Sequence, residues 1–156
     1  MDFSHFFLKT TGFIGFVPLL EIDTAACPSS GGVYVITYNT NGQTSFRDKS
    51  CGGWHKGKDP TVSLDILAKE WVEGAEVVYI GKGDNLKRRL RQFANFGSGK
   101  PVGHWGGRLI WQLENINALR VAWKETQGQK PHVVEKELIS TFKSTYGKLP
   151  FANLRI

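Results

Sequence analysis

The chain has 156 residues, of which 40% are hydrophobic and 12% aromatic, and these values predict one folded domain rather than a disordered chain. No run of about 18 apolar residues occurs, so no membrane span is expected, and the start lacks the pattern of a secretion signal. Cys27 and Cys51 have neither CxxC nor zinc-site spacing, which favours free thiols and a cytoplasmic location.

The formal net charge is +6, and the positive charge is concentrated in one part of the chain. Between positions 82 and 108 the only acid is Asp84, whereas the basic residues there are Lys82, Lys87, Arg88, Arg89, Arg91, Lys100 and Arg108. Such a local excess favours a nucleic-acid partner, because each neutralised phosphate releases counterions.

Residues 1–30 are expected to be an extension that packs on the core, with an edge strand in the apolar stretch 13–20, where Pro18 is tolerated. Residues 31–38 alternate as a strand that places Tyr34 on the face opposite to Val33. The Asn-Gly pair in 39–42 predicts a hairpin turn after it.

Residues 43–76 form a long insertion whose first half is polar and rich in glycine. Its second half predicts a helix over 63–73 from the spacing of apolar residues. Trp54, His55, Lys56 and Lys58 combine aromatic rings with positive charge, as a loop that contacts a nucleic-acid strand does. A solvated surface loop explains them equally well.

The stretch 77–90 predicts a buried strand over 77–80, a glycine hinge at Gly81 and Gly83, and a basic helix over 85–96 capped by Asp84 or Asn85. A loop over 97–107, a short helix over 108–113 and a strand over 119–125 follow. The last helix is expected over 132–146, because Pro131 starts it and Gly147 ends it.

Helical periodicity separates neighbouring charged residues in these two helices. Arg89 lies within the apolar arc of the first helix, whereas Arg88 and Arg91 point away from it. In the last helix Glu135 lies at the centre of the apolar stripe and Glu137 lies opposite. An inward carboxylate needs a partner, so Glu135 is either in a buried salt bridge or a ligand of Mg²⁺. Arg89 is suited to grip a phosphate oxygen.

Two tyrosines lie in the two most strand-like segments. Tyr34 and Tyr79 are compatible with ordinary packing, but a phenol beside a cation can also orient or deprotonate a water molecule.

With these residues assembled, the chain resembles the GIY-YIG nuclease superfamily. The first signature is Gly32-Val33-Tyr34, with valine at the middle position, and the second, Tyr79-Ile80-Gly81, is complete. The segments 84–90, 134–139 and 151–154 resemble the arginine helix, the glutamate helix and the closing asparagine element of that family. The resemblance covers 31–38 and 77–154.

The resemblance implies an α+β fold with a central three-stranded antiparallel sheet flanked by helices, over residues 31–156 with the insertion 43–76. It also implies a DNA endonuclease of a repair or restriction type that uses Mg²⁺, with Mn²⁺ as a substitute ion. RNA is a second candidate substrate, and a homodimer is expected where both strands are cut.

The implied site contains Tyr34, Tyr79, Arg89, Glu135 as the metal ligand, and Asn153 as a structural or phosphate-side hydrogen-bond donor. Gly81, Lys82 and His104 are auxiliary candidates, and the nucleic-acid contacts are Lys87, Arg88, Arg91, Lys100 and Arg108. Several members of the family carry His or Tyr one turn after the arginine, where this chain has Phe93, so His104 is a candidate for that role.

Two alternatives belong to other functional classes. A non-catalytic nucleic-acid-binding module would retain the fold and the basic residues without cleavage. A nucleotide-binding protein would use Gly81-Lys82-Gly83 as a phosphate loop, but neither complete phosphate-binding glycine motif occurs.

Overall fold

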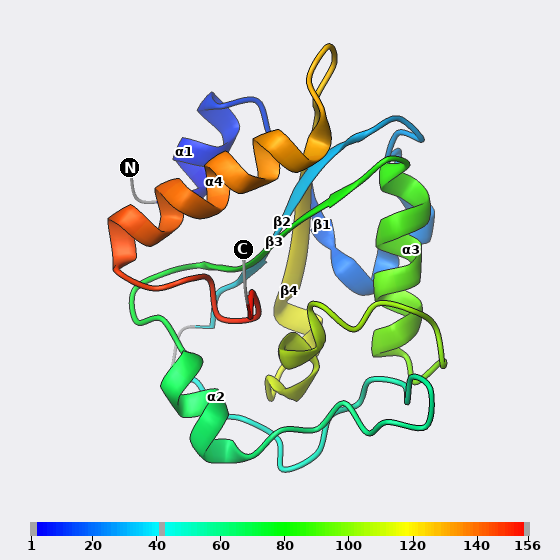
Figure 1. Cartoon of the computed structure of the whole chain (residues 1–156), viewed down its shortest axis with the longest axis vertical. Helices are drawn as coiled ribbons and strands as arrows, with labels where there is room; N and C mark the ends of the chain where they lie inside the picture. The colour runs from blue at the N-terminus through cyan, green and yellow to red at the C-terminus, as the bar shows by residue number, and fades with distance from the viewer. Residues whose placement is uncertain (1–2, 41–42, 155–156) are drawn as a thin grey trace.

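The computed structural model describes residues 3–40 and 43–154, which form an α+β fold with four strands in one antiparallel sheet. The strands are β1 (Ile14–Pro18), β2 (Gly32–Tyr38), β3 (Val77–Gly83) and β4 (Leu119–Glu125), in the order β1-β4-β2-β3 (Figure 1). The α+β class is thus as predicted, but the sheet has a fourth strand, since the expected edge strand of the extension pairs with β4.

Helices cover both faces of the sheet (Figure 1). On one face lie α1 (His5–Thr10) and α4 (Pro131–Tyr146), whose apolar side chains pack with Val33 and Val35. The other face is covered by α3 (Leu86–Gly97), η1 (Leu19–Thr24) and η2 (Arg108–Gln112), which pack around Tyr34 and Ile36. The short η3 (Ile116–Ala118) leads into β4. The alternation predicted for β2 is confirmed.

β3 differs from the prediction of a short strand followed by a glycine hinge. It continues through Gly83, with Gly81 opposite Tyr34 and Gly83 opposite Gly32 in β2. Neither Gly81 nor Gly83 has a positive φ, so both continue the extended backbone instead of bending it. The register shifts beside Val77, where a bulge places Val78 and Tyr79 in the same part of the core.

The insertion packs on the domain instead of extending from it. Gln112 of η2 is fully buried. Its side chain forms hydrogen bonds to both ends of the first half of the insertion, at Arg47 and Val62. The side-chain oxygen of Gln112 accepts from the Val62 N–H at 2.8 Å, and its nitrogen donates to the carbonyls of Arg47 and Val62. The predicted turn at 39–42 includes Asn41 and Gly42, which lie outside the described residues.

The helix of the insertion, α2 (Leu64–Glu70), is shorter than the predicted 63–73. Ser63 caps its start, and Trp71 leaves the helix in an extended conformation to pack against Phe46 and Phe151. The predicted helix over 108–113 is the 3₁₀ turn η2. Within the described residues, no helix combines the length and apolar character needed to cross a membrane.

Candidate active site

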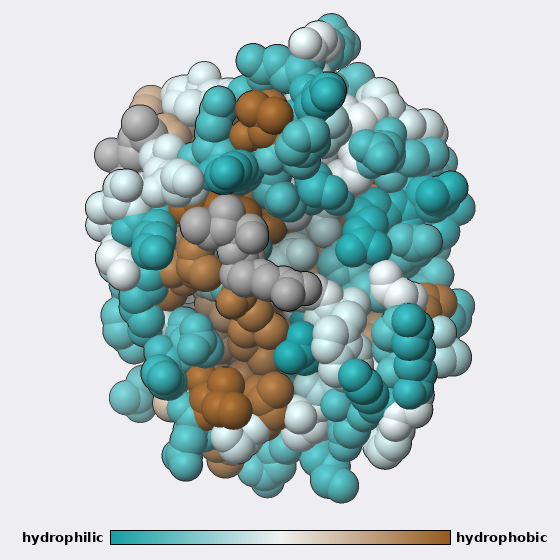
Figure 2. Space-filling view, viewed as in Figure 1, coloured by the Kyte–Doolittle hydropathy of each residue, from teal (hydrophilic) through white to brown (hydrophobic). Residues whose placement is uncertain are grey.

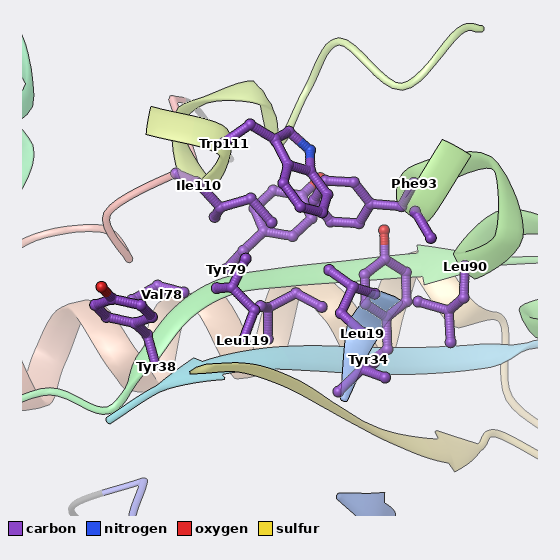
Figure 3. Packing of buried hydrophobic residues seen from close by; sticks show 14 of the residues in the cluster. Leu19, Tyr34, Tyr38, Val78, Tyr79, Leu90, Phe93, Ile110, Trp111 and Leu119 are labelled. Atoms are coloured by element: carbon purple, nitrogen blue, oxygen red, sulfur yellow. The ribbon is translucent and has the colours of Figure 1, made fainter. Parts of the chain in front are cut away.

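Tyr34 and Tyr79 come from the paired strands β2 and β3, and their ring centroids lie 6.1 Å apart (Figure 3). Tyr34 is fully buried because its ring lies across Gly81, where any Cβ would collide with that ring. The auxiliary role predicted for Gly81 is therefore steric: it leaves space for the Tyr34 phenol. Burial raises the pKa of Tyr34 well above its usual range and that of Tyr79 to about 12, although Arg89 lowers both.

Arg89 is placed by the start of α3. The Asn85 side chain caps this helix by accepting from the Arg88 N–H at 3.0 Å, which settles the choice between Asp84 and Asn85. The Arg89 Nη1 donates to the Gly103 carbonyl at 3.1 Å and to Gln92 Oε1 at 3.3 Å. Arg89 is half-buried, while Arg88 and Arg91 are exposed, so the helical phase is confirmed.

Glu135 reaches the same place from α4, on the opposite face of the sheet. It is half-buried, whereas Glu137 is exposed, as the helical phase predicted. Burial raises the pKa of the Glu135 carboxyl, and the positive charges of Lys82 and Arg89 partly offset this. Within residues 3–40 and 43–154, no ion pair joins Arg89 to Glu135, so the buried salt bridge offered as an alternative is not formed.

A cavity of about 480 Å³ lies between these residues. Tyr34, Tyr79, Lys82, Arg89 and Glu135 all line it. Hydrophilic side chains gather over α3, whereas hydrophobic ones gather near α2 on the other side of this view (Figure 2). The structure thus brings together four of the five predicted catalytic residues and Lys82.

Asn153, the fifth, has a structural role. Its Oδ1 accepts from the Ile80 N–H and its Nδ2 donates to the Ile80 carbonyl, both at 2.9 Å. The amide is buried and both of its ends are engaged with the backbone of β3. Asn153 therefore holds the strand that carries Tyr79 in place, and its membership of the catalytic group stays a prediction.

His104 lies behind Tyr34 instead of in the cavity. Its Nε2 is 3.0 Å from the Tyr34 hydroxyl, and its ring stacks on Phe93 with centroids 3.7 Å apart. Burial and then Arg89 lower the pKa of His104 to about 3, so the imidazole is neutral. A general base must reach the reacting proton directly or through one water, so His104 can act only through Tyr34.

The predicted nucleic-acid contacts are dispersed. Arg88 lines the cavity, but Arg91 forms an ion pair with Asp23 at 2.7 Å. The Lys87 backbone N–H donates to the Pro28 carbonyl. Burial raises the pKa of the Cys27 thiol, and the positive charge of the Lys87 side chain partly offsets this. Lys100 is exposed in the loop after α3, and Arg108 lies over the Trp105 ring. These five positions stay predicted contacts, and Arg88 is placed at the cavity itself.

The carboxylate of Glu135 fits the ion that the resemblance implies. Mg²⁺ prefers oxygen ligands and often takes one carboxylate while keeping several waters. Glu135 supplies the carboxylate, and the cavity has room for water around it. No group of three or more His, Cys, Asp or Glu side chains suited to a metal occurs among the described residues.

Four further residues of the cavity were not predicted as site residues: Gly83, Asp84, Asn85 and Gln92. Asp84 lines it next to Lys82 and leaves the capping of α3 to Asn85. Gln92 lines it as well and orients Arg89. Its position three residues after Arg89 on the same helix is a signal that could have identified it.

No protein-family model, curated protein or solved structure matches this chain. Its own geometry offers a guanidinium, a carboxylate and two phenols around one open cavity. A guanidinium and a carboxylate without a mutual ion pair can both contact a third group. A phosphate could contact the Arg89 guanidinium and, through a shared cation, the Glu135 carboxylate, so that the charges of both side chains would be balanced.

Proposed function

We propose that this chain is a Mg²⁺-dependent nuclease of the GIY-YIG type that hydrolyses a phosphodiester bond of a nucleic acid. One observation carries the proposal: Arg89 and Glu135 come from helices on opposite faces of the sheet and line one cavity without an ion pair between them in the described residues. Arg89 already donates to Gly103 and Gln92, so its guanidinium is oriented before substrate binds.

Each residue has a defined task in this proposal. Arg89 donates to a non-bridging oxygen of the phosphate and stabilises the charge that develops on it. Glu135 would hold Mg²⁺, and the ion would supply positive charge to offset the charge that develops on the leaving oxygen. Lys82 is exposed at the rim and attracts the polyanion.

The tyrosines orient the nucleophilic water. At neutral pH both phenols are protonated, because burial raises the pKa of each. Tyr79 lines the cavity and can accept a hydrogen bond from the water through its phenol oxygen. Tyr34 positions this group, and His104 fixes the Tyr34 ring from behind.

The test is cleavage of supercoiled, linear and branched DNA, and of RNA, with and without Mg²⁺. Arg89→Ala and Glu135→Ala are expected to lower the rate by about 10²–10³-fold or more. The chain offers matched controls on the same two helices: Arg91→Ala, which removes an arginine paired with Asp23, and Glu137→Ala, which removes an exposed carboxylate. Both controls should cleave within about threefold of the native chain.

Two results would count against the proposal. Cleavage that persists in both Arg89→Ala and Glu135→Ala would remove these residues from the site. Binding of nucleic acid without any Mg²⁺-dependent cleavage would instead support the non-catalytic module.

A further inference from the structure

A second cavity, of about 580 Å³, adjoins the first and shares Tyr79 and Glu135 with it. The other residues that line it are Trp105, Gly106, Arg108, Ile139, Asn153 and Leu154. If a phosphate of a nucleic acid is held in the first cavity between Arg89 and Glu135, the nucleoside attached to that phosphate lies next to the second cavity. The proposed function assigns no role to it.

One wall of the second cavity is a preformed stack of an arginine on an indole. The Arg108 guanidinium carbon lies 4.7 Å from the Trp105 ring centroid, and Arg108 Nη1 donates to the Trp105 carbonyl at 3.3 Å. The indole in turn meets the edge of Phe96 from α3. Both stacked side chains are half-buried, so ordering them costs little when a ligand arrives.

The second cavity also has an apolar part, which is formed by aliphatic side chains. Ile139 is buried and Leu154 is 42% exposed, and both line the cavity. A phosphate group would satisfy Arg108 but would leave this apolar surface uncovered. A planar heterocycle covers it, because nucleobases stack on aromatic rings and on guanidinium planes while their edges accept and donate hydrogen bonds. The volume lies within the range of about 300–1,000 Å³ found for small-ligand pockets.

Resting on the proposed function, we propose that the second cavity receives one unpaired nucleobase next to the phosphodiester that is cut. Inside a duplex both faces of a base are covered by its neighbours, so a base enters such a cavity only from a single-stranded or displaced position. The substrate class is therefore nucleic acid with an unpaired nucleotide at the cleavage site. Stacking on Trp105 and Arg108 gives no strong preference among the four bases.

Binding without metal tests the subsite independently of cleavage. Three short DNA duplexes are compared in EDTA: fully paired, with one bulged 2-aminopurine, and with one bulged abasic residue. The native chain should bind the bulged base about 5- to 100-fold more tightly than the other two and quench its fluorescence. Trp105→Ala should remove that preference, and Trp105→Phe should retain most of it.

Phe6→Ala is the matched control, because Phe6 is an aromatic residue of α1 that is 77% exposed and lines neither cavity. It should keep the preference for the bulged base. Equal binding of the bulged base and the abasic residue by the native chain would overturn the subsite, even if Trp105→Ala does not fold. An equal loss in Phe6→Ala and Trp105→Ala would overturn it as well.

The two proposals fail in different ways. Cleavage that depends on Arg89 and Glu135 but ignores the bulged base refutes the subsite alone. A preference for the bulged base that is lost in Trp105→Ala, in a chain that never cleaves, refutes the nuclease and leaves the subsite as a binding site.

Discussion

The hydroxyl of Tyr34 lies 3.0 Å from Nε2 of His104, and both side chains are completely buried. The two groups come from β2 and from the loop after α3, so their contact joins the sheet to the loop whose Gly103 carbonyl accepts from Arg89. The pair therefore connects the first tyrosine of the candidate site to the support of its arginine.

Removing the Tyr34 hydroxyl should be costly for stability. In Tyr34→Phe the buried Nε2 of His104 loses its partner, and we expect the free energy of unfolding to fall by about 1–3 kcal/mol. His104→Phe keeps the stack on Phe93, so the double variant, which removes both polar groups, should cost less than the two single variants together. Urea denaturation measures all three; additive costs would show that the pair does not interact.

The burial of His104 predicts a loss of stability in mild acid. The folded pKa of His104 is about 3 and its ordinary value is 6.5, so the unfolded chain binds the proton first. Stability is fully present above pH 6.5 and falls as the pH decreases toward 3, by up to about 1.4 kcal/mol per pH unit. Tyr34 and Arg89 face the ring, and the Arg89 charge lowers the pKa further.

Urea midpoints at pH 7.5, 6.5 and 5.5 measure this slope. His104→Phe should have a flatter profile than the native chain over this interval, because the remaining histidines carry no such burial. Parallel profiles would assign the acid sensitivity to other groups.

Asn153→Ala should destabilise the fold more than it changes the chemistry. Two buried hydrogen bonds to Ile80 are lost, which should lower the free energy of unfolding by about 2–3 kcal/mol and Tm by roughly 5–10 °C. Asn39→Ala, which removes an exposed amide bonded to Glu76, is the control and should change little. Calorimetry gives Tm, and nuclease assays well below Tm should show rates within about threefold of native. A hundredfold loss of rate there would assign Asn153 to the catalytic group.

The exposed arginines of α3 should differ in their salt dependence. Arg88 lines the first cavity without an ion pair to a described residue, whereas Arg91 is paired with Asp23. Arg88→Gln should lower the slope of log K against log salt by about 0.9, and Arg91→Gln by less. Fluorescence anisotropy from 50 to 200 mM salt measures both slopes. Asp23→Asn should strengthen binding, because it releases Arg91 from the ion pair. Equal slopes in the two arginine variants would contradict the assignment of Arg88, rather than Arg91, to the phosphate contact.

The sequence was most informative where periodicity applies. Alternation in β2 placed Tyr34 correctly, and helical phase separated Arg89 from Arg88 and Glu135 from Glu137. These choices depend on local geometry, which each segment carries in its own residues.

Long-range contacts were not predictable in this way. His104 meets Tyr34 across 70 positions, and Asn153 meets Ile80 across 73. Gly81 suggested a hinge, but the ring of Tyr34 is what requires a glycine there, and that ring comes from another strand. The fourth strand was expected as an edge strand of the extension, yet its pairing with β4 made the sheet larger than the resemblance implied.

The last described residues also finish the sheet. β3 is an outer strand, and Asn153 occupies the N–H and carbonyl of Ile80 while the Ala152 N–H donates to the Val78 carbonyl at 2.8 Å. An outer strand with free backbone groups is a template onto which a second molecule can add. Here those groups of Val78 and Ile80 are already satisfied within the same chain. This part of the outer edge is therefore closed to an added strand from a second molecule.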